Sequence, residues 1–212
     1  MDLDPHAAIG ETPPARRKSG RKSRRDQITD IAVELFAQNG FDRTSIRDIA
    51  DAAGLTKPAL YYHFQDKEAL FEHVLVERMS ELIASVSTAI DEVEDPLDRI
   101  RAFLVTHAGR MDDERDAWMM SRQSYPTLQD EDRRMRVTRL RDTFERTLRD
   151  LIQDAIDAGQ LNADTNPTLV GRLLLSAVND VPRWLRPNGR MTAREVARTY
   201  VDITLRGVGA AI

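Results

Sequence analysis

The chain has 212 residues, of which 41% are hydrophobic, and its formal net charge is -4. This length and apolar content suit a small module joined to one larger domain with a sizeable core. The absence of cysteine excludes a disulfide framework and any thiolate metal site. No apolar run has the length of a transmembrane helix or a secretory signal, so we expect a cytoplasmic protein with no membrane partner.

The charge is distributed unevenly along the chain. Residues 1–25 hold seven Lys or Arg against three acidic residues, which gives +4 there and therefore -8 in the remainder. Residues 1–22 are rich in Pro, Ser, Gly and charge, which predicts a disordered basic arm. Such an arm would enter a minor groove or neutralise phosphates of a nearby nucleic acid. A tail that only improves solubility is the alternative.

Apolar periodicity begins at Ile28 and continues to Phe36, at helical spacing. We therefore expect a first helix with one buried stripe, ended by Asn39-Gly40. Phe41 follows directly and is expected to fill a small core. The apolar positions of the stripe are Ile28, Ile31, Ala32, Leu35 and Phe36.

Residues 41–71 contain local signals for a helix, a tight turn, a second short helix and an abrupt third helix. Ser45 and Asp48 fit a capping box, and Gly54 accepts the positive φ that the following turn requires. Thr56 can cap the second helix, and Pro58 in its first turn loses no intrahelical hydrogen bond. This layout predicts a helix-turn-helix, whose second helix reads the major groove of DNA.

The second helix of this motif has an inner and an outer face. Leu60 and Phe64 lie four residues apart and are expected to face inward. The remaining positions have the chemistry to contact bases and phosphates, and Lys67 in the next helix would add a phosphate contact. Alternatively, the two tyrosines are half-buried packing residues and the histidine is a surface residue without a partner. The outward positions are Lys57, Ala59, Tyr61, Tyr62 and His63.

The sequence TSIRDIADAAGLTKPALYYHFQDKEALF resembles the DNA-binding signature of the TetR family of one-component bacterial repressors. The resemblance covers roughly residues 24–75, about a quarter of the chain. It implies an all-helical dimer with a small-molecule pocket in a divergent C-terminal part. By position, it implies DNA contacts at Ser45, Arg47, Thr56, Lys57, Ala59, Tyr61, Tyr62, His63 and Lys67.

The rest of the chain continues as helices. A pattern without Gly or Pro from Asp66 to about residue 92 predicts one long helix, which could tilt as a rigid body and move the DNA reader. Further helices are expected from Asp95-Pro96 to about Gly109, around Trp118 with a break near Tyr125-Pro126, over 129–158, from Asn166-Pro167 to a bend or end at Pro182, and from Thr192. The predicted fold is all-α with about nine helices. Its parts are an arm (1–22), a helix-turn-helix domain (23–68) and a ligand-binding and dimerisation domain (69–212).

The last two predicted helices are strongly apolar on an otherwise charged protein. This favours a homodimer in which four helices from two chains form a bundle. Two readers about one DNA turn apart would then bind a pseudo-palindromic operator. The alternative is that both helices complete the core of a monomer.

Residues 179–189, followed by Thr192, are similar to the end of a helix in a TetR branch that responds to acyl-CoA thioesters. The chain departs from that branch at Asp180 and Leu185, where aromatic residues are frequent. An acyl-CoA requires an apolar slot and cations for its phosphates. Core filling by the apolar residues and solvation of the arginines are the alternatives. The candidates are Phe103, Trp118, Met119, Leu174 and Val178 for the slot, Arg122, Arg172, Arg183 and Arg186 for the phosphates, and Trp184 beside them.

No residue pattern points to catalysis or to a bound metal. His107 has no second ligand at metal-binding spacing, so we expect it to be hydrogen-bonded or exposed. A phosphate-cradling glycine loop, a nucleophile motif and an acid/base pair are all missing, so neither an enzyme nor a cofactor is expected. The sequence predicts a homodimeric repressor released from its operator by a small molecule. An architectural DNA-binding protein, a transcriptional activator and an enzyme of the second domain are the alternatives.

Overall fold

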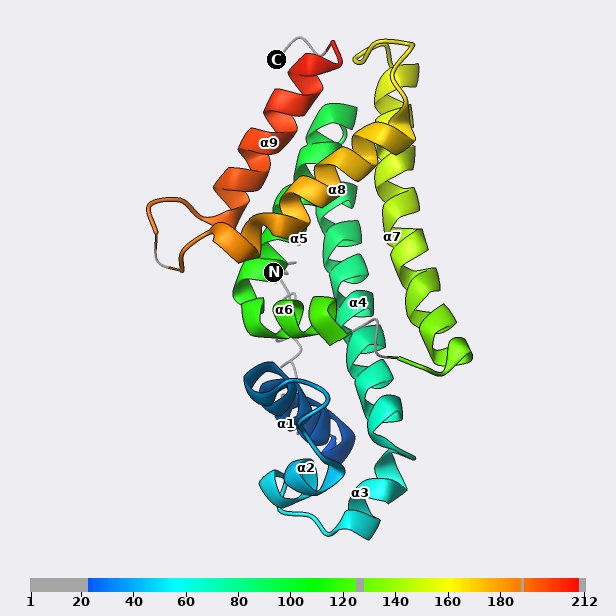
Figure 1. The fold of residues 1–212 in the computed structure, drawn as a ribbon. Coiled ribbons are helices and arrows are strands. Elements are labelled where there is room, and N and C mark those ends of the chain that lie inside the picture. Colours follow the sequence, from blue (N-terminus) through cyan, green and yellow to red (C-terminus); the bar gives the residue numbers. More distant parts are fainter. Residues whose placement is uncertain (1–22, 125–127, 188, 210–212) are drawn as a thin grey trace, which may run out of the picture.

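The computed structural model describes residues 23–124, 128–187 and 189–209, which form nine α-helices and no β-strand. This architecture confirms the predicted all-α fold (Figure 1). Within these ranges no helix is both long and apolar enough to cross a membrane. The basic arm predicted for residues 1–22 lies outside them. The helices are α1 (Arg24–Asn39), α2 (Ile46–Ala52), α3 (Lys57–His63), α4 (Lys67–Asp91), α5 (Pro96–Asp113), α6 (Arg115–Ser124), α7 (Glu131–Asp157), α8 (Pro167–Trp184) and α9 (Ala193–Gly207).

The first three helices form a small N-terminal module, drawn in blue and cyan at one end of the molecule in Figure 1. Its core gathers apolar side chains from α1, α2, α3 and the start of α4. Phe36, Phe41 and Phe71 meet there, with ring centroids between 4.7 and 5.7 Å apart. Phe41 therefore fills the core of the module, as its position after α1 predicted.

The caps of these short helices are formed by the residues that the sequence indicated. Oγ of Ser45 accepts a hydrogen bond from the amide of Asp48, whose carboxylate accepts one from the Ser45 amide at 2.8 Å. Oγ1 of Thr56 accepts from the amide of Ala59 at 3.3 Å. Gly54 has a φ of 63°, a conformation that side chains disfavour. The turn is thus specified by contacts within a few residues.

Helix α4 leaves the module and runs along the C-terminal bundle beside α5 and α7 (Figure 1). Asp66 caps its first turn, and its 25 residues confirm the long uninterrupted helix expected from the sequence. The bundle core is assembled from α4, α5, α7, α8 and α9. Phe103, Leu148 and Leu174 are fully buried at its centre.

The short helix α6 lies between the module and the bundle and contributes to both. Ala117 and Met120 belong to the module's core, together with Leu128 and Val137. Trp118, on another side of the same helix, packs against the bundle core. The core of the module therefore includes residues from α6 and α7, far beyond residue 68. The predicted boundary between the two domains at residue 68 remains a proposal.

Two helix ends differ from the expectation. Helix α5 continues past Gly109 to Asp113, and the guanidinium of Arg194 on α9 lies against this glycine, where a Cβ would otherwise be. Helix α8 continues past Pro182 to Trp184, so the proline lies in the last turn. The helix break expected around Tyr125-Pro126 lies outside the described residues.

Candidate functional site

Helix α3 presents a polar and aromatic surface at the tip of the module. Leu60 is fully buried and anchors the helix on the module's core. Tyr62 is 87% exposed and Tyr61 is 49% exposed, while Lys57 is also exposed. Large aromatic side chains lose hydrophobic stabilisation when they stay in water, so such exposure on a short helix indicates a surface that contacts a partner.

The other residues implied by the resemblance lie around this helix in different settings. His63 and Ala59 are half-buried, and Arg47 on α2 is exposed and lies 3.6 Å from the carboxylate of Asp51. Lys67 is half-buried: its Nζ donates to the carbonyl of Phe41 at 2.9 Å and lies 4.2 Å from the centre of that residue's ring. Besides any contact with phosphate, Lys67 therefore fixes the loop after α1.

A group of ion pairs joins the start of α4 to α7. Arg133 donates to both carboxylate oxygens of Asp66, the cap of α4, at 2.7 and 2.9 Å. Its Nε lies 3.7 Å from the carboxylate of Glu72, which Arg136 also contacts. The guanidinium of Arg133 holds the pKa of the Asp66 carboxyl below its usual value. Helix α7 thereby clamps the end of α4 that follows α3.

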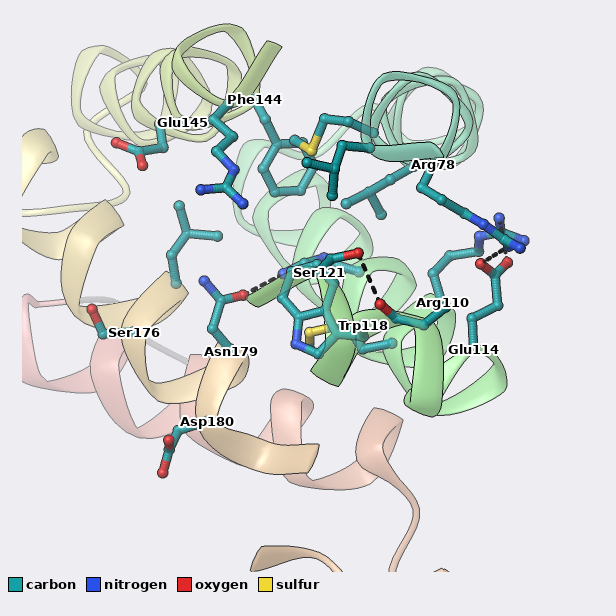
Figure 2. Close-up of a pocket in the computed structure, with 18 of the residues that line it drawn as sticks. Arg78, Arg110, Glu114, Trp118, Ser121, Phe144, Glu145, Ser176, Asn179 and Asp180 are labelled. Atoms are coloured by element: carbon teal, nitrogen blue, oxygen red, sulfur yellow. Dashed lines mark hydrogen bonds and ion pairs between the residues drawn. The ribbon is translucent and has the colours of Figure 1, made fainter. Parts of the chain in front are cut away.

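A cavity of about 730 Å³ lies inside the bundle, a size that suits a small-molecule ligand. Helices α4 to α8 all contribute to its wall, and much of the wall is apolar. Figure 2 shows Trp118 and Ser121 of α6 facing the space that Phe144 and Asn179 border from other helices. The apolar part of the wall consists of Leu75, Met79, Leu82, Met111, Ala117, Trp118, Val137, Phe144, Leu173, Leu175 and Ala177.

Charged groups lie at two sides of the cavity. On one side, Arg110 pairs with Glu114 at 2.6 Å, and Arg78 pairs with the same carboxylate. On the other side are Glu145, Ser176 and Asp180 (Figure 2). The wall therefore offers hydrogen bonds and charges at the periphery of an apolar centre, the usual arrangement in ligand pockets.

His107 is the one fully buried titratable side chain in the cavity wall among the described residues. It is 1% exposed, and its Nε2 lies 2.7 Å from Oδ1 of Asn179. Burial lowers the pKa of its imidazole to about 4, so the ring is neutral at neutral pH. We predicted that His107 would be either hydrogen-bonded or exposed, and it is hydrogen-bonded. Over the described residues, no group of acidic, histidine or cysteine side chains is arranged to hold a metal ion.

Of the ten effector-binding candidates, Trp118 is the one that the structure places in this wall among the described side chains. Phe103, Leu174 and Val178 face the solid bundle core and are fully buried there. Met119 lies outside the wall, on a different face of α6 from Trp118. Helical spacing identified these residues as inward-facing, but neighbouring helices decide which inward positions border a void.

The charged and C-terminal candidates also lie away from the cavity wall. Arg183 is exposed and pairs with Asp180 at 3.2 Å, and Trp184 is 50% exposed at the end of α8. Arg172 and Arg186 are exposed as well. The side chain of Arg122 lies outside the described part of the chain.

Several wall residues gave no sequence signal that singled them out. Arg141 and Glu145 on α7 have the spacing of a solvated salt-bridge pair, and Asn179 on α8 is an isolated amide. Leu75 and Met79 fit the apolar stripe of α4 without any mark of a pocket. The sequence offered one hint of the cavity: His107, which had no assigned role, and Trp118, eleven residues later, both lie in its wall.

Two family models match the chain. Residues 28–74 match the N-terminal model of the bacterial regulatory proteins of the tetR family, and residues 93–208 match the tetracyclin repressor-like C-terminal domain. The second match alone covers more than half of the chain. The chain belongs to the TetR family. It is therefore a DNA-binding transcriptional regulator of that family and not an enzyme, as the sequence predicted.

Individual relatives match over nearly the full length. The transcriptional repressor KstR2 of Rhodococcus jostii is 29% identical over 93% of this chain and 97% of its own length. The structure of the TetR-family regulator PfmR from Thermus thermophilus is 35% identical, with a TM-score of 0.77 over 84% of this chain and 97% of its own. AibR, solved in complex with isovaleryl coenzyme A and operator DNA, has the same fold, with 24% identity, a TM-score of 0.76, and coverage of 85% and 97%.

Proposed function

We propose that this TetR-family regulator is a homodimeric repressor that leaves a pseudo-palindromic operator when a small molecule enters the cavity of its bundle. One observation carries the proposal: α6 borders the cavity with Trp118 and Ser121 and packs on the N-terminal module with Ala117 and Met120. A molecule that shifts α6 would therefore act directly on the support of the DNA-reading helix.

A second route leads through α4. Leu75, Met79 and Leu82 line the cavity, and the same helix begins just after α3, at a cap held by Arg133. Because α4 is continuous over this length, a displacement at the cavity reaches the module as a rigid-body motion. In each protomer the ligand would change the position of the recognition helix and therefore its fit to the second half-site.

We assign DNA contact to the surface of α3 and its neighbours. Lys57, Tyr61 and Tyr62 are the exposed side chains that would reach bases and phosphates, with His63 and Ala59 beside them. Ser45, Arg47, Thr56 and Lys67 would hold the phosphate backbone on either side. The capping role of both hydroxyls is compatible with this, because a capped helix terminus also offers backbone amides to a phosphate.

An acyl-CoA thioester is the effector class that we propose. The apolar centre of the cavity suits an acyl chain, and Arg172, Arg183 and Arg186 supply exposed cations on α8 and directly after it. AibR, which shares this fold, accommodates a coenzyme A thioester. The likeness of residues 179–189 to an acyl-CoA-responsive branch supports the same assignment.

We place the dimer interface on α8 and α9. Leu169 on α8 and Ile203 on α9 are each 64% exposed, and Leu173 on α8 is 58% exposed. Exposed leucine and isoleucine side chains on two adjacent helices indicate a surface that a second copy would cover. Analytical ultracentrifugation of a Leu169→Glu, Ile203→Glu double variant should give monomers where the natural chain gives dimers.

The experiment that tests the proposed function is fluorescence anisotropy on labelled DNA from upstream of the protein's own gene. Titration is done with and without a panel of short, long and aromatic acyl-CoAs. Saturable, salt-sensitive binding that one thioester reverses would support the operator and the effector class together. Binding that no thioester reverses would keep the regulator and remove the acyl-CoA assignment.

A further inference from the structure

Two polar nitrogen atoms in the cavity wall have no hydrogen-bond partner among the described residues: Nδ1 of His107 and Nε1 of Trp118. Both atoms are closed to solvent, and they come from adjacent helices, α5 and α6. Buried polar atoms in folded proteins are nearly always paired. Two unpaired atoms in one ligand cavity therefore carry information about the ligand.

The hydrogen-bonding character of each atom follows from its surroundings. Oδ1 of Asn179 can only accept, so Nε2 of His107, which lies 2.7 Å away, carries the ring proton and donates it. Nδ1 of the neutral ring is then an acceptor. The indole Nε1 of Trp118 can only donate. The wall thus has one free acceptor and one free donor.

The two rings are close to each other. The imidazole and indole rings meet edge to face, with centroids 5.4 Å apart and planes at 76°. Phe144 covers the imidazole from another side, with a centroid distance of 5.1 Å. The two nitrogen atoms therefore belong to rings that contact each other in the cavity wall, beside a third aromatic ring.

We propose that the effector carries a hydroxyl group on the part that enters this cavity, accepting from Nε1 of Trp118 and donating to Nδ1 of His107. A ketone would pair only with Trp118, and a saturated chain would pair with neither. Because both atoms are shielded, the hydroxyl reaches them through a shift of Trp118, which lies on the helix that packs against α1. The inference rests on the proposed function in taking this cavity as the effector site.

The test uses the fact that the chain has two tryptophans, Trp118 and Trp184. In a Trp184→Phe variant, indole fluorescence reports on Trp118 alone. The probes are decanoyl, 3-oxodecanoyl, 2-hydroxydecanoyl and 3-hydroxydecanoyl groups, each as a CoA thioester and as a short N-acetylcysteamine thioester. We expect one hydroxy isomer to bind at least about tenfold more tightly than the decanoyl compound, with the ketone between them.

Two variants test whether the preference for a hydroxyacyl group depends on Nδ1 of His107 and Nε1 of Trp118. His107→Phe should remove the advantage of the hydroxyl over the ketone, so that the hydroxy and oxo compounds bind this variant with equal affinity. Trp118→Phe, followed by calorimetry, should remove the advantage of the ketone over the saturated chain. Circular dichroism identifies a variant that does not fold, and the other variant then decides.

The outcomes separate this inference from the proposed function. Equal affinity for all four acyl groups would overturn the hydroxyl and leave the effector cavity in place. Binding of the short thioesters alone, with the hydroxyl preference intact, would support the hydroxyl and remove coenzyme A. Binding of no probe of either kind would overturn the effector class, and the hydroxyl with it.

Discussion

The N-terminal module and the C-terminal bundle use the same kind of helix for opposite purposes. In the module, α3 buries one leucine and leaves Tyr61 and Tyr62 in solvent, so its chemistry is on the outside. In the bundle, the notable polar groups are inside: His107 is buried, and Trp118 borders a cavity. A surface that reads DNA must be rigid and exposed, whereas a cavity that binds an effector must be enclosed and able to shift.

The largest expected effect concerns the bundle core. Phe103 is fully buried, and its ring centroid lies 4.5 Å from that of Phe144 in the cavity wall. Replacement by alanine should lower the free energy of unfolding by about 3–5 kcal/mol, since it removes a large buried side chain and leaves a void. Urea unfolding measures this. If the free energy of unfolding fell by less than about 1 kcal/mol, the conclusion that Phe103 is tightly packed in the core, away from the cavity, would be wrong.

The second effect is the pH dependence of stability that His107 introduces. Its pKa of about 4 in the folded chain lies below the ordinary histidine value of 6.5, so between these two pH values the unfolded chain binds a proton that the folded chain excludes. The free energy of unfolding should therefore be constant above pH 6.5 and fall by up to about 3 kcal/mol as the pH drops towards 4.

Two variants test whether His107 causes this loss of stability at low pH. His107→Phe should flatten most of the decline between pH 6.5 and 4.5, as measured by urea unfolding at each pH. His73→Gln is the matched control, because burial also lowers the pKa of that imidazole but its side chain is partly exposed. An unchanged decline in His107→Phe would show that other groups cause it.

The third effect concerns the surface of the module. Tyr62 is 87% exposed, so Tyr62→Ala should leave the melting temperature almost unchanged. Operator affinity should fall by about 1–3 kcal/mol, the usual size for one contact at a base or phosphate. Anisotropy at fixed salt measures the affinity, and Gln65→Ala, at an exposed position just beyond α3, is the control. Full affinity in Tyr62→Ala would remove Tyr62 from the DNA contacts.

The smallest effect concerns the clamp between the two regions. Arg133→Gln should cost about 1 kcal/mol, a discounted value because the Asp66 side chain is 46% exposed. This corresponds to a melting temperature lower by about 2–4 °C for a chain of this size. The control is Arg134→Gln, whose 3.4 Å pair with Glu131 stays within α7. Equal melting temperatures for the two variants would show that the clamp does not stabilise the module.

The two regions also differ in how far their structure followed from sequence. In the module, Ser45, Gly54 and Thr56 specify caps and a turn through contacts within three residues or through a local φ, so the motif and its boundaries were predicted. The family signature also lies in this region. Local rules sufficed because the function depends on which side chains face away from a small core.

In the bundle, the helices were predicted, and the resemblance implied a pocket, but most of the residues that line the cavity were not predicted. The apolar pattern of α8 showed that Leu174 and Val178 face inward, yet it did not show that they contact solid core while Leu175 and Asn179 border a void. Gly109 was predicted to end a helix, since its contact with Arg194, a residue far away in the sequence, could not be seen from local patterns. Such features depend on the relative rotation of packed helices, which no local pattern encodes.

The most direct test of the account is the distance between the two recognition helices of the dimer, with and without effector. The chain has no cysteine, so a Gln65→Cys variant carries one spin label in each protomer, directly after α3. Pulsed electron paramagnetic resonance should give a different label-to-label distance when an effector that releases the operator is added in excess. The same distance with and without that ligand would contradict a switch transmitted through α4 and α6.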